Sequence, residues 1–97
     1  MKVQNIINNN GNRAANQFVI KHNGQTYFQS YDSVIAKYDE NGRLTVTPLW
    51  DYSATTRKHF YIFINDYCPN YVGRRESILR GIADGSIAVV RDGHLDF

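Results

Sequence analysis

Hydroxyl, aromatic and basic side chains are concentrated in one stretch of the chain, LWDYSATTRKHFYIF. Ser53, Thr55 and Thr56 stand where a helix is expected to begin, and Arg57 and Lys58 follow them directly. The free N–H groups and positive dipole end of a helix N-terminus bind phosphate, so this stretch could hold an anion. Alternatively, one hydroxyl caps the helix and the others pack against the preceding strand. The sequence favours capping, because no glycine-rich loop accompanies the stretch.

A second candidate site is a cluster of basic residues on the two expected helices. If the helices pack side by side, these residues form one positive face that is interrupted by tyrosines, and this face could contact nucleic-acid backbone or an acidic protein surface. Alternatively, it is a solvated helix surface that neighbouring acidic residues partly neutralise. The residues predicted to contact a partner are Arg57, Lys58, Arg74, Arg75, Tyr61 and Tyr71.

Patterns for catalysis or metal binding are poor. His22, His59 and His94 fall at a hairpin tip, on a helix and after the last turn, without the spacing of metal ligands. Cys68 and His59 do not suit a nucleophile pair, because nine residues of helix turn about 180° beyond two full turns. The sequence therefore predicts no metal, no cofactor and no enzymatic activity.

The N-terminal segment is rich in asparagine. Residues 1–16 hold too few apolar side chains to order themselves, so we predict a partly flexible segment. Only Ile6 and Ile7 could anchor it, as part of a short edge strand. Residues 17–97 are predicted to form a single α+β domain.

Two β-hairpins are expected to follow. Asn23-Gly24 suits a two-residue turn, since both residues tolerate positive φ, and it places Val19 opposite Phe28. The second hairpin turns at residues 39–42, DENG, whose length and final glycine suit a type I turn with a bulge.

An amphipathic helix is expected next, because apolar residues recur at i, i+3, i+4 and i+7 from Phe60 onward. Ser53 or Thr55 would cap its first turn, and Pro69 would end it. Trp50 is expected to lie over the core. Tyr52 is expected to lie there too, rather than to form a stacking platform.

A shorter second helix is expected over residues 75–84, with Leu79 on its inner side. A strand, a turn at Asp92-Gly93 and a short return would close the chain. The predicted fold class is α+β, with an antiparallel β-sheet of hairpins packed against two helices.

Composition narrows the class of protein. Ninety-seven residues suit one domain, and a net charge of +2 does not by itself indicate a nucleic-acid binder. A single cysteine excludes an internal disulfide and favours a reducing compartment. The N-terminus, MKVQNIINNN, lacks the apolar core of a signal peptide, and no apolar run reaches the length of a membrane span. We therefore expect a cytoplasmic protein without a membrane partner.

Two motifs resemble a family of small bacteriophage-encoded proteins of unknown function. Residues 30–36, SYDSVIA, are similar to the family pattern S-Y-x-[ST]-x-[IV]-A. Residues 52–59, YSATTRKH, are similar to its Y-S-x-T-T-x-[KR]-H pattern. The resemblance covers about residues 27–67. It implies a phage or prophage source, hence a site of action in the host cell, and it carries over no catalytic residues.

These observations predict a small, non-enzymatic protein-binding module. Small phage proteins often bind and block host machinery, so the partner is expected to be a host or phage protein, for example a CRISPR or other antiphage defence component. The alternative is a nucleic-acid-binding accessory protein that uses the basic helical face. Salt separates the two, because phosphate-driven binding falls steeply with ionic strength.

Overall fold

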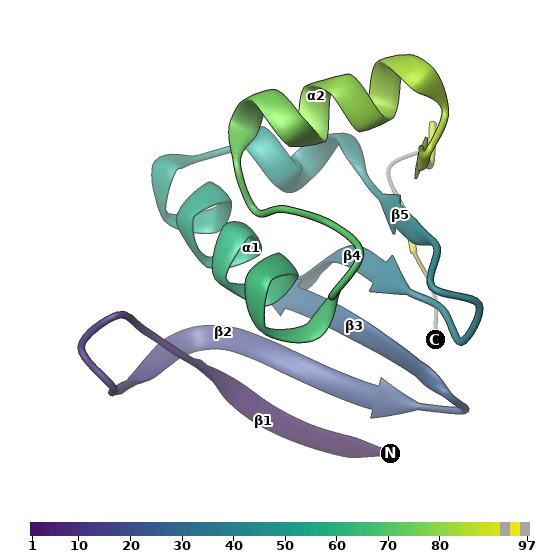
Figure 1. Cartoon of the computed structure of the whole chain (residues 1–97). Helices are drawn as coiled ribbons and strands as arrows, with labels where there is room; N and C mark the ends of the chain where they lie inside the picture. Colours follow the sequence, from purple (N-terminus) through teal and green to yellow (C-terminus); the bar gives the residue numbers. More distant parts are fainter. Residues whose placement is uncertain (92–93, 96–97) are drawn as a thin grey trace.

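The computed structural model describes residues 1–91 and 94–95, and it shows an α+β fold in which two helices cover one face of a sheet (Figure 1). Six strands lie side by side in chain order. They are β1 Lys2–Ile7, β2 Arg13–His22, β3 Gln25–Ser30, β4 Ser33–Tyr38, β5 Leu44–Val46 and β6 Ile87–Val89. The helices are the 3-10 turn η1 Pro48–Asp51, α1 Ala54–Tyr67 and α2 Arg75–Asp84. The predicted fold class is confirmed.

Both predicted hairpin turns are present. Asn23 and Gly24 have φ of 53° and 80°, and Val19 pairs with Phe28 as expected. In the second hairpin Gly42 has φ of 80°, and its N–H donates to the carbonyl of Asp39 over 3.0 Å. The positive φ that these turns need is supplied by Asn23 and Gly24 in the first hairpin and by Gly42 in the second.

The N-terminal segment forms an edge strand, as its two isoleucines allowed, but more of it belongs to the sheet than was predicted. The boundary expected at residue 16 lies inside β2, and β1 forms an edge strand that pairs with it antiparallel. Ile6 is fully buried against the core, and the side-chain amide of Asn5 donates to the carbonyl of Ala14 over 2.9 Å. A hairpin partner thus supplies the order that the asparagine-rich composition could not supply alone.

The last strand also differs from the prediction. β6 runs parallel to β5, with Val46 opposite Val89, whereas the other strand pairs are antiparallel. The chain leaves β5, crosses over through α1 and α2, and returns in the same direction, which is the connection that a parallel pair requires. The turn expected at Asp92-Gly93 lies outside the described residues.

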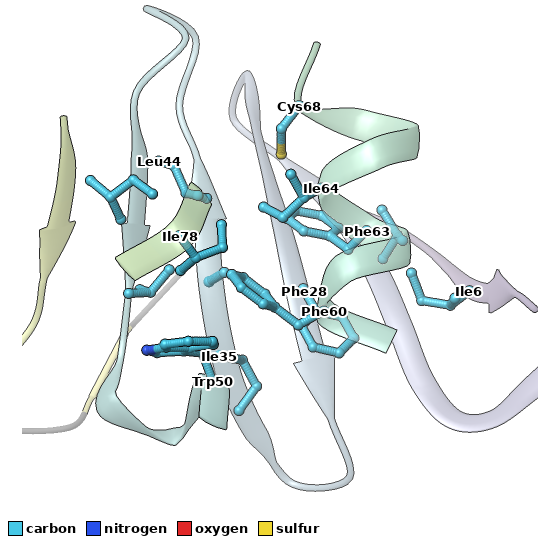
Figure 2. Packing of buried hydrophobic residues seen from close by; sticks show 14 of the residues in the cluster. Ile6, Phe28, Ile35, Leu44, Trp50, Phe60, Phe63, Ile64, Cys68 and Ile78 are labelled. Carbon is cyan, nitrogen blue, oxygen red and sulfur yellow. The ribbon is translucent and has the colours of Figure 1, made fainter. Parts of the chain in front are cut away.

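Helix α1 packs on the sheet through aromatic rings. Phe60, Phe63 and Ile64 are fully buried, as their spacing predicted. The Phe63 ring stacks on the Phe28 ring of β3 with 5.6 Å between centroids, and the Phe60 centroid lies 6.3 Å from that of Phe28 (Figure 2). Trp50 then covers Phe60 at 5.7 Å, and these rings form the centre of the core.

Helix α2 packs through a narrower face than expected. Ile78 and Gly81 are buried, whereas Leu79 is 45% exposed. The inner positions are three residues apart, and Leu79 lies one residue from Ile78, about 100° away around the helix. Gly81 allows the close approach of β6, because a Cβ there would lie 2.5 Å from Cδ1 of Ile87.

No helix in the described part of the chain is long and apolar enough to cross a membrane.

The first prediction concerns Gly81. Alanine is the better helix former by about 1 kcal/mol, yet we expect Gly81→Ala to lower the free energy of unfolding by about 1 kcal/mol, because the added methyl overpacks the buried Ile87. In an Ile87→Ala background, which removes the clashing atoms, the same substitution should be neutral or stabilising. Urea unfolding of the four proteins of this double-mutant cycle measures the reversal. A stabilising effect of Gly81→Ala in the natural sequence would refute the close-packing explanation.

Candidate functional site

Two of the four predicted basic residues meet around one carboxylate. Arg57 of α1 and Arg75 of α2 each place Nη1 2.7 Å from Oδ1 of Asp51, at the end of η1. The Arg75 guanidinium also lies over the Trp50 ring, 5.8 Å from its centroid. Asp51 therefore joins the starts of the two helices and fixes the direction of both arginine side chains.

The shared carboxylate has a perturbed pKa. Hydrogen bonds from Arg75, and then from Arg57, hold the pKa of Asp51 below its usual range. The same pairing raises the pKa of Arg75. Two positive charges thus share one negative charge, so this part of the surface is less basic than its sequence indicates.

Two other predicted basic residues remain at the surface. Lys58 is exposed on α1, and Arg74, which precedes α2, has a 66% exposed side chain with Nε 3.4 Å from Oε1 of Glu76. Arg57, Lys58 and Tyr61 line one shallow cavity of about 360 Å³ together with Asn9 of the β1–β2 loop. We call the surface formed by Arg57, Lys58, Tyr61, Arg74 and Arg75 the basic face.

Tyr61 and Tyr71, the two tyrosines predicted to contact a partner, lie in different parts of the structure. Tyr61 is half-buried beside Arg75, and loss of solvent raises the pKa of its hydroxyl. Tyr71 stands apart from the basic face. Its hydroxyl accepts a hydrogen bond from the N–H of Leu44 over 3.1 Å and donates to the carbonyl of Ser86 over 2.9 Å. Tyr71 thus ties β5 to the turn before β6, a role that the sequence pattern did not indicate.

Ser53 caps helix α1. Its backbone is extended, with φ of −145°, and its Oγ accepts a hydrogen bond from the N–H of Thr56 over 3.1 Å. Thr55, the other predicted cap, is exposed. The expectation that one hydroxyl caps the helix is therefore confirmed, and the residue is identified.

The prediction did not include a cavity that the two family-like motifs form together. It encloses about 320 Å³ between the β3–β4 turn and the start of α1. We call it the junction cavity. It is lined by Ser30, Tyr31, Ser33, Ile35, Leu49, Tyr52, Ser53 and Thr56. All but Leu49 come from residues 30–36 and 52–59, the two motifs that resemble the phage family. The resemblance of these motifs was the only feature of the sequence that could have pointed to the cavity.

Trp50 and Tyr52, two aromatic residues near this cavity, differ in how deeply they are buried. Trp50 lies over the core with 5% exposure, as predicted. Tyr52 was expected beside it, but it is 78% exposed. The difference has a local cause, since Trp50 lies within the 3-10 turn η1 as its buried residue, whereas Tyr52 follows that turn.

Cys68 is not an available nucleophile. It is fully buried at the end of α1, and burial raises the pKa of its thiol to about 12, so the thiol stays protonated at neutral pH. Within the described residues, no group of three or more His, Cys, Asp or Glu side chains could hold a metal ion.

Comparison with known proteins places the chain in a protein family. The chain matches the model of the family of unknown function DUF8033 over residues 1–79, and it belongs to that family. The match includes the N-terminal hairpin, both motifs and the first half of α2. No curated protein and no solved structure matches this chain.

The second prediction tests the helix cap. Ser53→Ala should lower the free energy of unfolding by about 1 kcal/mol, because the N–H of Thr56 loses its acceptor. Thr55→Ala is the matched control and should change stability by less than about 0.5 kcal/mol, as an exposed residue without a capping role. Urea unfolding compares them. Equal effects would mean that Ser53 does not cap the helix.

The third prediction follows from the lowered pKa of Asp51. A carboxyl whose pKa is lower in the folded state stabilises the fold above its unfolded pKa of about 3.9, and this contribution is lost as the pH falls through the folded value. Asp51→Asn should therefore lower the thermal midpoint at pH 7, and the difference from the natural protein should shrink below about pH 4. The exposed Asp32 provides the control variant Asp32→Asn, with little difference at either pH. A difference that persists unchanged at pH 2 would contradict the ion pair as its source.

Proposed function

We propose that this chain is a non-enzymatic protein-binding module encoded by a phage or prophage. It acts in the cytoplasm of the host cell, where it binds a host or phage protein. The proposal includes inhibition of host machinery, with CRISPR and other antiphage defence components as the class of target.

The single observation that carries the proposal is the shared carboxylate of Asp51. Arg57 and Arg75 are held in place by it at 2.7 Å, while their side chains remain 33% and 54% exposed. Arginine side chains that are oriented before binding lose less conformational freedom when a partner covers them. Arginine and tyrosine are also the residues that most often dominate binding energy at protein interfaces, and Tyr61 lies beside this pair.

Charge supports a protein partner over a nucleic acid. A surface that grips phosphates needs several unpaired cations, since each neutralised phosphate contributes through counterion release. Two of the four basic residues here are already paired with Asp51, and Arg74 is paired with Glu76. A mixed face of paired arginines, one lysine and a tyrosine suits an acidic patch on a protein.

The fourth prediction tests the basic face by charge reversal. Lys58→Glu/Arg74→Glu changes two exposed residues, and the Arg74–Glu76 ion pair that it breaks lies in solvent, with both side chains 66% exposed, so the thermal midpoint should change little. The same change should abolish capture of the partner, because reversed charge repels an acidic surface. Arg57 and Arg75 are left intact, since reversing them would surround Asp51 with like charge.

The measurement is capture from a bacterial host lysate on the immobilised chain, followed by mass spectrometry. The lysate is treated with nuclease, so that a protein bound only through nucleic acid is lost. Lys2→Glu/Arg13→Glu, at exposed positions on β1 and β2, lowers the net charge equally, by four units from +2 to −2, and should retain the partner. Retention by the Lys58/Arg74 variant would exclude the basic face, and loss of capture after nuclease would favour the nucleic-acid alternative.

A further inference from the structure

The junction cavity holds a run of hydroxyl groups with one hydrogen-bond donor left over. Ser53 Oγ donates to Thr56 Oγ1 over 3.2 Å, and Thr56 Oγ1 lies 3.1 Å from Ser30 Oγ. Three hydroxyl protons thus serve two hydrogen bonds. Whichever of Ser30 and Thr56 donates to the other, one proton of this pair has no acceptor within the run.

The spare donor is buried in the lining of the cavity. Ser30 is 4% exposed and Thr56 5% exposed, and both line the junction cavity. A buried donor without a partner is costly, so a hydrogen-bond acceptor that enters the cavity gains a favourable contact. Gln17, opposite Ser30 on β2, is fully buried, and both polar atoms of its amide lack a partner within the described residues. The layer around Ser30 therefore has more hydrogen-bonding capacity than the fold itself uses.

The mouth of the cavity is aromatic. Tyr31 is 55% exposed and Tyr52 is 78% exposed, and the two come from the two different motifs. Tyr31 also keeps φ of 54°, which is unusual for a bulky residue, and its N–H is held by the carbonyl of Asn16 over 2.7 Å. Core packing does not account for either ring, because both project into solvent.

The described lining suits uncharged ligands. Its eight described residues include no Asp, Glu, Lys, Arg or His, so a phosphate or an ammonium group would meet no side chain of opposite charge among them. Ile35 and Leu49 give the cavity apolar walls. A volume of about 320 Å³ lies near the lower end of ligand pockets, which run from about 300 to 1,000 Å³, so the cavity suits a small ring system.

We propose that the junction cavity binds a nucleobase, with the base placed against Tyr31 and Tyr52 and one of its edge acceptors bonded to the spare hydroxyl of Ser30 or Thr56. A nucleobase combines the features that this lining selects: a flat face for aromatic stacking, carbonyl or ring-nitrogen acceptors at its edge, and no charge. The base could belong to a free nucleoside or to a single strand. The cavity is a site separate from the basic face.

The fifth prediction is saturable binding of nucleosides. Uridine, cytidine, adenosine and guanosine are titrated into the ¹⁵N-labelled full chain, and at least one should shift the backbone amides of residues 30–33 and 53–56. Tyr52→Ala should weaken that binding about tenfold or more, because base–aromatic stacking is lost, whereas Tyr52→Phe keeps the ring and should bind as the natural protein does. Tyr31→Ala repeats the test from the other motif, and the amide spectrum of each variant confirms folding.

Binding of matched ligands shows which part of the nucleoside the cavity recognises. Ribose alone should not bind, and the nucleoside 5′-monophosphate should bind no more tightly than the nucleoside. A short single-stranded oligonucleotide separates the two sources: tighter binding than the nucleoside identifies a strand, and equal or weaker binding identifies the free nucleoside. The proposal is overturned if no nucleoside gives saturable shifts, if ribose binds equally, if the monophosphate binds tenfold more tightly, or if Tyr52→Ala binds unchanged. Lys58→Glu/Arg74→Glu should bind the nucleoside normally, so the result is independent of the basic face.

Discussion

The packing of Phe28 against Phe60 and Phe63 is the contact on which the rest of the structure depends. Phe28 lies on β3, inside the sheet, and is fully buried. Its ring is 5.6 Å from that of Phe63 and 6.3 Å from that of Phe60, so two successive turns of α1 are held on one strand residue. Aromatic rings bury large apolar areas and prefer particular offsets, which fixes both the position and the rotation of the helix.

The rotation of α1 decides what its first turn can do. Once Phe60 faces the sheet, Thr56, one turn earlier, also faces inward and meets Ser30 of β3 at 3.1 Å. Ser53 is then free to cap the helix and to extend the hydroxyl run. On the outer side of the same turn, Lys58 is exposed, and Arg57 is partly exposed and paired with Asp51. One helix start therefore serves two surfaces of opposite character, the uncharged junction cavity and the basic face.

Asp51 gives the basic face its form. The carboxylate lies between the two helices, and both Arg57 and Arg75 donate to it. This arrangement reduces the net positive charge and at the same time orients the guanidinium groups. A surface of this kind recognises shape and hydrogen-bond geometry more than charge density, which is the physical basis for proposing a protein partner.

The sequence by itself determined the elements whose signals are local. The Asn23-Gly24 turn, the apolar stripe of α1 and the α+β class follow from backbone preferences and spacing within a few residues. The tertiary structure decided what depends on residues distant in the chain. β1 is ordered by its hairpin with β2, β6 is parallel because two helices intervene, and Tyr71 reaches Leu44 and Ser86 across the fold. The junction cavity belongs to this second group. Its two motifs are each readable in the sequence, but only the packing of Phe28 against α1 brings them to one place, because the spacing within a strand or a helix carries no information about which elements meet.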